Sequence, residues 1–338
     1  MATVQDVAKK AGVAPITVSR VVNNSGYVSK ETRERVEAAV TELGYVPNTL
    51  ARSLRSKRTH TLALVLSDIT NPFFTLLARG VEDAASDAGF TVVFCNTDES
   101  EKEERRYLEL LLQKKVDGIL LVPARLAADS VSFIQSQGTP VVVLDRRLSE
   151  PLTDVVRCDS ETGAYQLMRL LLQLGHRRIA ILSGPPHVST AIDRVAGCQR
   201  AMADFGAADL AVDVYYGSFT HASGGQMARR AVATEPRPSA LFAANNFIAI
   251  GALRALHDLG VKVPEEMALV GFDDLPPSLI TFPFLTVAAQ PAYEMGEKGT
   301  RLLLERLSGK NGDPPREVVL PVELIVRQSS GNGPGKAG

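Results

Sequence analysis

The chain has 338 residues, of which 45% are apolar and 22% charged, values typical of a folded globular protein rather than a disordered one. At about 100 to 200 residues per domain, this length predicts two or three domains. No apolar run approaches about 18 residues, and the start of the chain lacks the apolar core of a secretory signal. We therefore expect no membrane span and a cytoplasmic location.

The three cysteines give no sign of a disulfide framework or of a metal site. Cys95, Cys158 and Cys198 are odd in number, lie far apart and follow no CxxC or other metal-ligand spacing. We therefore expect no structural zinc, no other metal and no cofactor.

Charge is unevenly distributed along the chain, although the formal net charge is only −1. Residues 1–58 contain ten Lys or Arg against five Asp or Glu, a balance of +5, whereas the remainder contains 27 against 33, a balance of −6. Because a local cluster of cations is what neutralises phosphates, this division is typical of a nucleic-acid-binding head joined to a body of another function. A solvated basic surface is the alternative that charge alone leaves open.

The amino-terminal segment shows the pattern of three short helices. The first is expected between Thr3, which can cap it, and Gly12, which can end it. A second begins at Pro15, a residue suited to a first turn, and its valines give it an apolar face. A third runs between the cap Ser29 and Gly44. Two short helices across a glycine turn, braced by a third, make a helix-turn-helix unit, although any three-helix bundle could show this spacing.

In a helix-turn-helix unit the second helix enters the major groove of DNA. Its exposed face carries Pro15, Ile16, Thr17 and Arg20. Arg20 can make a bidentate contact to guanine, whereas Ile16 offers only an apolar contact, for example to a thymine methyl. We therefore expect this face to read the bases.

The segment PNTLARSLRSKRTH, residues 47–60, combines an apolar face with strong positive charge. Leu50, Ala51 and Leu54 share one face, and arginines and lysines stand around them. The segment is too short for a stable isolated helix, which needs roughly 12 to 15 favourable residues in water, so we expect it to fold only on DNA or a partner. A leucine flanked by arginines suits insertion into the minor groove, where it can kink the duplex. A solvated linker between domains is the alternative.

The head and this segment together resemble the lactose repressor (LacI/GalR) family of bacterial transcription regulators, and the similarity extends through about residue 328. VAKKAGVAPITVSRVVN corresponds to the helix-turn-helix of that family and NTLARSL to its hinge helix, with Leu54 as the intercalating lever. The resemblance implies a homodimer on a palindromic double-stranded operator. The residues that it implies at the DNA are Thr3, Pro15, Ile16, Thr17, Ser19, Arg20, Asn23, Ala51, Leu54 and Arg55.

The second helix departs from the family in two ways. Ala14 stands where the family usually has a capping serine, so a side-chain cap and a phosphate contact are missing. Pro15 and Ile16 stand where members often carry polar residues that read bases. The operator sequence therefore does not carry over from a relative.

From Thr61 onward, short apolar runs alternate with helical stretches, the pattern of βαβ units around parallel sheets. About 270 residues with this rhythm divide into two doubly wound lobes. The predicted fold is a small all-α helix-turn-helix head plus an α/β body with two doubly wound parallel-sheet lobes, like periplasmic binding proteins. The expected parts are the head at 1–46, the hinge helix and linker at 47–60, the effector-binding and dimerisation domain at 61–329 (lobe one about 61–158 and 291–319, lobe two about 159–290 and 320–329), and a disordered tail at 330–338.

Polar and aromatic residues follow the predicted strands of both lobes. Because ligands lie beyond the carboxyl ends of the strands in open parallel sheets, these residues are candidates for one effector site. Each of them alone could instead cap a helix or bridge the lobes, and their joint occurrence is what favours a site. The candidates are Asp68, Asn71, Phe73, Phe74, Asp145, Arg146, Thr190, Arg194, Phe219, Asn245, Asp273 and Gln290.

This set of side chains suits a polyhydroxyl ligand. Carboxylates and amides pair with vicinal hydroxyls, arginine donates in a planar fork, and aromatic rings cover the apolar face of a sugar. The candidates also resemble the cleft of periplasmic ribose-binding proteins, where NPFF, DR, RxxG, ND, GFD and AQ motifs supply the sugar contacts. Asn246 replaces the aspartate that usually follows Asn245, which would alter a structural hydrogen bond more than a ligand contact. We expect a monosaccharide effector, with a ribose-like pentose in first place.

An enzyme is the main alternative from another class, but the chain has no GxxxxGK[ST], GxSxG or HExxH motif and its five histidines are scattered. We expect no enzymatic activity. A periplasmic transport receptor would explain the body but not the head. The remaining alternatives keep the DNA-binding role and place a nucleobase, a phosphorylated metabolite or a partner protein where we expect a sugar. Val188 weighs against a purine, because a purine-responsive relative has arginine there.

The prediction is therefore a sequence-specific repressor of sugar-utilisation genes under allosteric control. A sugar that contacts both lobes would close them, and closure would change the order of residues 47–58 in the paired subunits. Because those residues are only marginally helical, we expect the sugar to act as an inducer.

Overall fold

The computed structural model describes residues 2–46, 58–276, 283–310 and 313–334. The chain divides into two compact units, Met1–Thr59 and His60–Gly338. The expected hinge helix, with Ala51, Leu54 and Arg55, lies outside the described residues. Within the described ranges, no helix combines the length and the apolar character that crossing a membrane requires.

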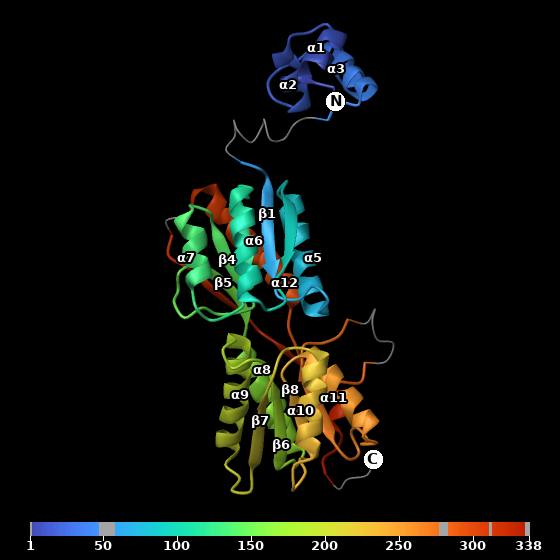
Figure 1. Ribbon diagram of the computed structural model, residues 1–338, viewed down its shortest axis with the longest axis vertical. Helices are drawn as coiled ribbons and strands as arrows, with labels where there is room; N and C mark the ends of the chain where they lie inside the picture. The colour runs from blue at the N-terminus through green and yellow to red at the C-terminus, as the bar shows by residue number, and fades with distance from the viewer. Residues whose placement is uncertain (1, 47–57, 277–282, 311–312, 335–338) are drawn as a thin grey trace. The chain divides into compact units, whose positions relative to one another are not determined.

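The first unit is the predicted three-helix head (Figure 1), with α1 at Val4–Ala11, α2 at Pro15–Val22 and α3 at Lys30–Leu43. Thr3 and Asp6 form a capping box at the start of α1, because each side chain accepts the backbone N–H of the other. Along the three helices, buried residues recur at helical spacing, and together they form one small core. Its fully buried side chains are Val7, Val18 and Val36.

The ends of the head helices agree with the sequence prediction. Gly12 and Gly44 end α1 and α3 at φ values of 64° and 56°, the left-handed region that glycine enters without strain. Ser29 Oγ caps α3 by accepting the Thr32 N–H. Ala14 gives α2 no side-chain cap, so the departure from the usual serine has the structural effect expected of it.

Lobe one of the second unit is a six-stranded parallel sheet in the order β11-β5-β4-β3-β1-β2. Its central strands are short and fully buried, so they form continuous apolar runs, as a sheet covered on both faces requires. The elements are β1 Thr61–Leu66, α5 Pro72–Asp87, β2 Thr91–Asn96, α6 Glu101–Gln113, β3 Gly118–Leu121, α7 Asp129–Ser136, β4 Val141–Leu144, β5 Asp154–Cys158, α12 Ala292–Glu305, η1 Arg306–Lys310 and β11 Glu317–Leu320.

The two faces of this sheet bury different side chains of the same strands. Leu62, Leu64 and Leu66 of β1 pack with α5 and α12, whereas Ala63 and Val65 pack with α6 and α7. This alternation is the period of two that a strand imposes. Lobe one is therefore a three-layer sandwich with two helices on each face (Figure 1).

Lobe two repeats the plan with the order β12-β10-β9-β8-β6-β7. Its strands are parallel except β12, which pairs antiparallel with β10 at the edge of the sheet. Figure 1 shows β6, β7 and β8 between the α8–α9 and α10–α11 pairs. The elements are α8 Ser160–Gln173, β6 Arg178–Ser183, α9 Ser189–Phe205, β7 Ala211–Tyr216, α10 His221–Val232, β8 Ala240–Ala243, α11 Asn246–Asp258, β9 Ala268–Phe272, β10 Thr286–Ala289, β12 Glu323–Ile325 and η2 Gln328–Ser330.

The chain passes between the lobes three times, at 158–160, 289–292 and 320–323. At the opposite end of β5 and β11 from these crossings, the fully buried Asp154 holds two arginines of the C-terminal region. Arg306 Nε and Nη2 donate to Asp154 over 2.9 and 2.6 Å, and Arg316 Nη2 donates over 3.0 Å. This network fixes β11 beside β5 at the edge of sheet one.

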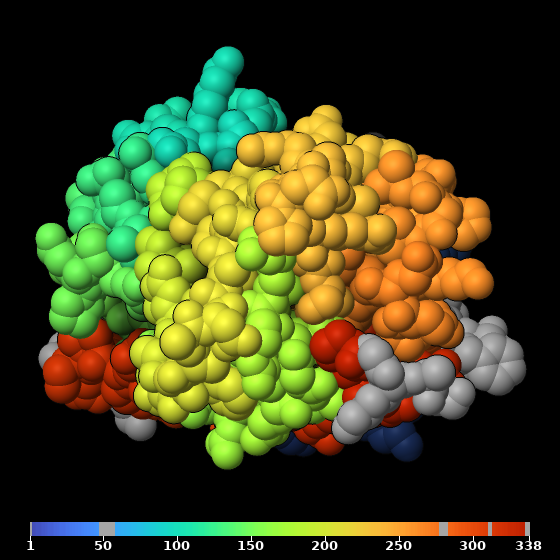
Figure 2. Space-filling view, turned by 90° about the horizontal axis from the view of Figure 1, so that it is seen from below, coloured from blue at the N-terminus to red at the C-terminus, as the bar shows by residue number. Residues whose placement is uncertain are grey.

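The expectation of a disordered tail from residue 330 is wrong for residues 330–334. Ser330 is buried in η2, and its hydroxyl lies 3.0 Å from the Thr286 hydroxyl. A Cβ on Gly333 would lie 1.9 Å from the Leu174 carbonyl oxygen, so this glycine permits close packing on lobe two. Figure 2 shows red C-terminal residues packed among the green and orange segments of that lobe. The glycines that suggested disorder serve this close approach.

Candidate functional site

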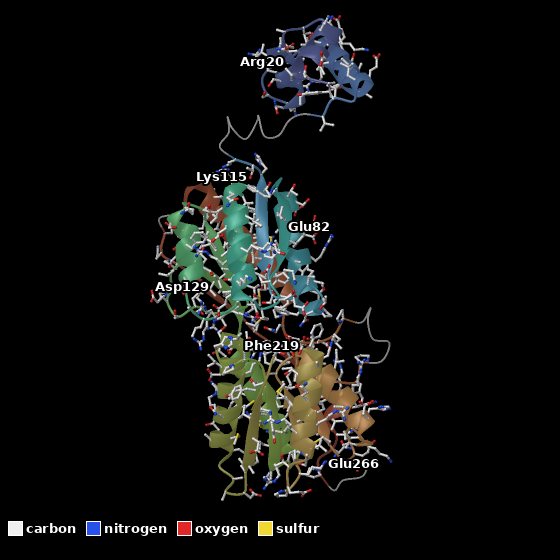
Figure 3. The ribbon with its side chains drawn as sticks, viewed as in Figure 1. Arg20, Glu82, Lys115, Asp129, Phe219 and Glu266 are labelled. Carbon is white, nitrogen blue, oxygen red and sulfur yellow. The ribbon has the colours of Figure 1, made fainter. Side chains whose placement is uncertain are left out.

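A cavity of about 190 Å³ lies between the carboxyl ends of the two sheets. All twelve candidate effector residues line it, and they come from both lobes. The labelled Phe219 marks its place at the junction of the lobes (Figure 3). Five further lining residues escaped the sequence analysis: Asp98, Glu99, Pro185, Ser218 and Thr220.

Asp145 and Asp273 occupy equivalent positions in the two lobes, directly after β4 and β9. Both have positive φ, 66° and 69°, in the left-handed region. Their backbone N–H groups donate to the neighbouring strand, at Val156 and Ala288, so the sheets hold both turns in place. Non-glycine residues in this region cost of order 1–3 kcal/mol and cluster at binding sites.

Both carboxyls are buried, and burial disfavours their charged form. Burial raises the pKa of Asp145 to about 6, although nearby Arg146 and Arg194 oppose the shift. Burial also raises the pKa of Asp273, against Arg194 and a hydrogen bond from Gln290. Gln290 Nε2 donates to Asp273 Oδ1 over 2.5 Å. The negative charge of the neighbouring Asp273 also raises the pKa of Asp145.

Arg146 does not present its guanidinium fork to the cavity, which corrects the sequence expectation. Nη1 donates to Glu99 Oε2 and to the Pro123 carbonyl, both over 2.7 Å, and Nη2 donates to Glu99 Oε1 over 2.5 Å. Glu99, itself at φ 60°, therefore holds the fork in a bidentate pair. Nε lies 3.8 Å from Asp145 Oδ2, too far for a hydrogen bond, and has no hydrogen-bond partner within the described ranges.

Arg194 of α9 is held in a similar way by its own lobe. Nη1 donates to the Ala244 carbonyl over 2.6 Å, and the guanidinium carbon lies 3.8 Å from the centre of the Phe272 ring, within cation–π range. Its Nε, like that of Arg146, has no hydrogen-bond partner among the described residues. Both arginines are thus positioned by protein groups before any ligand contact.

Four of the cavity-lining side chains carry a buried polar atom without a hydrogen-bond partner among the described residues. Two are acceptors, Asp145 Oδ1 and Gln290 Oε1, and two are donors, Arg146 Nε and Arg194 Nε. Buried polar groups are normally paired, because an unpaired one costs about 1–3 kcal/mol. Two acceptors and two donors on side chains of the same lining favour a ligand that both donates and accepts hydrogen bonds.

The aromatic lining depends on a glycine. A Cβ on Gly184 would lie 2.2 Å from the Phe219 ring, so the ring rests directly on the backbone after β6. Phe73 and Phe74 meet edge to face, with ring centres 5.0 Å apart, and both reach from the core of lobe one to the cavity. The cavity therefore has apolar walls in both lobes.

Several candidates also have a local structural role, as the sequence analysis allowed. Asn71 Oδ1 caps α5 through the Phe73 N–H, and Asn245 Oδ1 caps α11 through the Ile248 N–H. Asp68 Oδ1 accepts from the backbone and hydroxyl of Thr70. These side chains contribute to the cavity wall, but part of their hydrogen-bonding capacity is already used.

In the head, the recognition face of α2 is open. Ile16 is 55% exposed, Pro15 and Arg20 are exposed, and Thr17 and Ser19 are half-buried. Arg20 has no carboxylate partner among the described residues, and its side-chain stem lies against Gly26. It is therefore free to reach a ligand.

Three other side chains near this face differ in how free they are. Asn23 Nδ2 donates to the Ser19 carbonyl over 2.7 Å, and the Thr3 hydroxyl donates to Asp6, so both have intramolecular partners. Tyr27, 91% exposed directly after Gly26, is a further candidate that the pattern search overlooked, because a lone aromatic between helices belongs to no period.

Both parts of the chain match the same protein family. Residues 3–48 match the bacterial regulatory proteins of the lacI family, and residues 59–328 match the periplasmic binding proteins and sugar binding domain of LacI family. A ribose operon repressor of Halalkalibacterium halodurans is 39% identical over 98% of both chains. The transcriptional repressor PurR of Photobacterium profundum is 33% identical over 97% of this chain and 98% of that one.

Solved structures agree with these matches. The lac repressor dimer bound to operator and an anti-inducer has a TM-score of 0.84 at 28% identity and covers 97% of this chain and 99% of that one. A LacI family regulator from Enterococcus faecium with bound ribose has a TM-score of 0.71 at 30% identity and covers 82% of this chain and all of that one. With the helix-turn-helix head and the two parallel-sheet lobes described above, these matches establish that the chain belongs to the LacI family of DNA-binding bacterial regulatory proteins.

Proposed function

We propose that this protein is a dimeric repressor of sugar-utilisation genes that binds a palindromic operator and is released by a small neutral sugar, with a ribose-like pentose favoured. The open face of α2 supports the DNA contact, and the ribose operon repressor and ribose-bound regulator among its relatives support the effector. The location in the cytoplasm and the absence of enzymatic activity follow from this role.

The observation that carries the effector proposal is the set of four unpaired polar atoms on the cavity lining. Two acceptors and two donors call for a ligand whose groups can do both, and hydroxyl groups do so. The Phe73, Phe74 and Phe219 rings cover the apolar face that a sugar ring presents. At about 190 Å³, the cavity is smaller than the roughly 300 to 1,000 Å³ of pockets for drug-sized ligands, so it suits a monosaccharide.

The charge of the lining argues against a phosphorylated metabolite. Five carboxylates and only two arginines line the cavity, and Glu99 already neutralises the fork of Arg146. A phosphate would therefore meet a net negative wall. Among the small-molecule alternatives this leaves a nucleobase, which the similarity to PurR supports as the second candidate. Val188 weighs against it, because it brings no hydrogen-bonding side chain to the start of α9.

A thermal-shift series on the full-length protein tests the effector class. The compounds to add, one at a time, are D-ribose, other monosaccharides, guanine and ribose 5-phosphate. A compound that is the effector should stabilise the protein by about 2.7 kcal/mol when its concentration is 100 times its dissociation constant. Stabilisation by guanine or ribose 5-phosphate alone would overturn the sugar proposal. Arg194→Met, which removes an unpaired donor, should reduce the shift, whereas Arg200→Gln on the exposed face of the same helix should not.

An operator experiment tests the DNA-binding part separately. Analytical ultracentrifugation with a short duplex obtained by binding-site selection should show two protomers on each palindromic site. One protomer per specific site would contradict the dimer. Addition of the stabilising sugar should then release the duplex, and tighter binding would reverse the proposed sign of control.

A further inference from the structure

We propose that Arg147, Asp193 and Asn246 are positioning residues that hold the two lobes closed around the effector and thereby set how long it stays bound. None of the three lines the cavity. The proposal rests on the proposed function in one respect only, because it assumes that the effector occupies that cavity. It concerns two contacts between the lobes, which we call the ionic clasp and the amide clasp.

The ionic clasp joins the loop after β4 in lobe one to α9 in lobe two. Arg147 Nε and Nη2 donate to Asp193 Oδ1 over 3.0 and 2.9 Å, and Nε also lies 3.3 Å from Oδ2. The Arg147 backbone N–H donates to Ser189 Oγ over 3.1 Å. The Asp193 side chain is 16% exposed and that of Arg147 34%, so water screens this pair less than an ordinary surface pair.

The amide clasp joins the N-terminus of α5 in lobe one to that of α11 in lobe two. Asn71 Nδ2 donates to Asn246 Oδ1 over 3.0 Å, and Asn246 Nδ2 donates back to Asn71 Oδ1 over 2.9 Å. Both side chains are buried, at 5% and 0% exposure. Each oxygen also accepts a backbone N–H of its own helix, from Phe73 and Phe247, so neither amide can turn without breaking a cap.

The identity of residue 246 decides the strength of the amide clasp. An aspartate there could accept from Asn71 Nδ2 but has no N–H to donate, so only one bond would cross between the lobes. Asn246 makes the contact reciprocal. The departure from the ND motif that the sequence showed therefore adds a second hydrogen bond between the lobes.

Both clasps are made by protein atoms alone, and the lobes cannot part without breaking them. The lining residues therefore select the ligand, whereas the clasps add to its dwell time through the closed arrangement that they stabilise. The effect should fall on dissociation, because the clasps contribute only after the lobes have met. A role confined to local structure would instead leave the two clasps independent of each other.

Hydrogen exchange on the full-length protein, with no sugar present, tests the coupling between the clasps. Arg147→Gln breaks the ionic clasp, and exchange is followed at the Phe73 and Phe247 amides, which belong to the amide clasp. Both N–H groups are buried while the lobes are together. Because parting of the lobes exposes them to water, their exchange should rise by about two- to fivefold. The charge swap Arg147→Asp with Asp193→Arg should restore slow exchange. Arg200→Gln, which breaks the Arg200–Glu161 pair inside lobe two, is the matched control and should change nothing.

Stopped-flow release of D-ribose tests the consequence for the ligand. Arg147→Gln should speed dissociation by the same two- to fivefold, and Asn246→Ala, which removes two buried hydrogen bonds, by about three- to tenfold, with association rates unchanged. Unchanged exchange at Phe73 and Phe247 in Arg147→Gln, or a change in association alone, would overturn the proposal. If D-ribose does not bind the wild type, the preference for ribose fails while the exchange experiment still decides the clasps.

Discussion

Effector binding should weaken by about tenfold between pH 7 and pH 5, because protonation of Asp145 removes a negatively charged acceptor from the cavity. The buried Oδ1 of this residue has no hydrogen-bond partner among the described residues, and a ligand hydroxyl donates a much stronger, charge-assisted bond to the ionised carboxylate than to the protonated carboxyl group. Burial raises the pKa of Asp145 to about 6. The apparent dissociation constant therefore grows by a factor of 1 + 10^(pKa − pH), which is about 1.1 at pH 7 and about 11 at pH 5.

The stability of the sugar-free protein should respond to Asp145 in the opposite direction. The pKa of this residue lies higher in the folded protein than its ordinary value of 3.8, so the folded state binds more protons between about pH 4 and pH 6. Its contribution to the free energy of unfolding therefore rises as the pH falls through 6. Titration of Asp145 should therefore weaken sugar binding at pH 5 without lowering the free energy of unfolding.

Calorimetric titration with D-ribose at pH 5, 6 and 7 measures the effect, with circular dichroism to verify the fold at each pH. Asp145→Asn keeps a hydrogen-bond acceptor at this position but has no carboxyl group to titrate. The affinity of this variant for D-ribose should therefore depend less on pH. The pKa of Asp273 is also raised by burial and adds a change of the same sign. Equal affinity at pH 7 and pH 5, or an undiminished pH dependence in Asp145→Asn, would refute this reasoning.

Three further substitutions test other parts of the molecule. Arg20→Ala should cost about 1–3 kcal/mol at one base position, and binding-site selection that shows equal loss on all sequences would contradict base reading. Gly184→Ala should displace the Phe219 ring and weaken calorimetric D-ribose binding by about 1–3 kcal/mol, so an unchanged affinity would exclude that ring from the site. Asp154→Asn deprives the buried Arg306 of its carboxylate and should lower the free energy of unfolding by about 3–5 kcal/mol in urea titrations, whereas a loss below 1 kcal/mol would show the network to be dispensable.

Local patterns predicted the head and the position of the cavity well. Thr3, Gly12 and Gly44 mark helix ends because capping and left-handed φ depend on a few neighbouring residues. Every candidate effector residue lines the cavity because the carboxyl ends of parallel strands meet at one edge of a sheet. In both cases the rule uses only residues close together in the sequence.

Contacts between distant residues could not be predicted in this way. Glu99 pairs with Arg146 across 47 positions and Arg147 with Asp193 across 46, and no period links them. The sequence analysis consequently assigned the fork of Arg146 to the ligand, although Glu99 occupies it. The glycine-rich end was interpreted from composition, which does not show that Gly333 fits against Leu174.

Under the proposed function, closure of the lobes is a balance between opposing contacts. Asp145 and Asp273 come from different lobes, and their mutual repulsion when ionised opposes closure. The ionic and amide clasps favour closure but contact neither carboxylate. A neutral ligand with hydroxyl groups can donate to Asp145 in its charged form while its oxygens accept from Arg146 Nε and Arg194 Nε. An anion would add to the repulsion between the two carboxylates. The polar groups that select the ligand therefore also favour the closed arrangement of the two lobes.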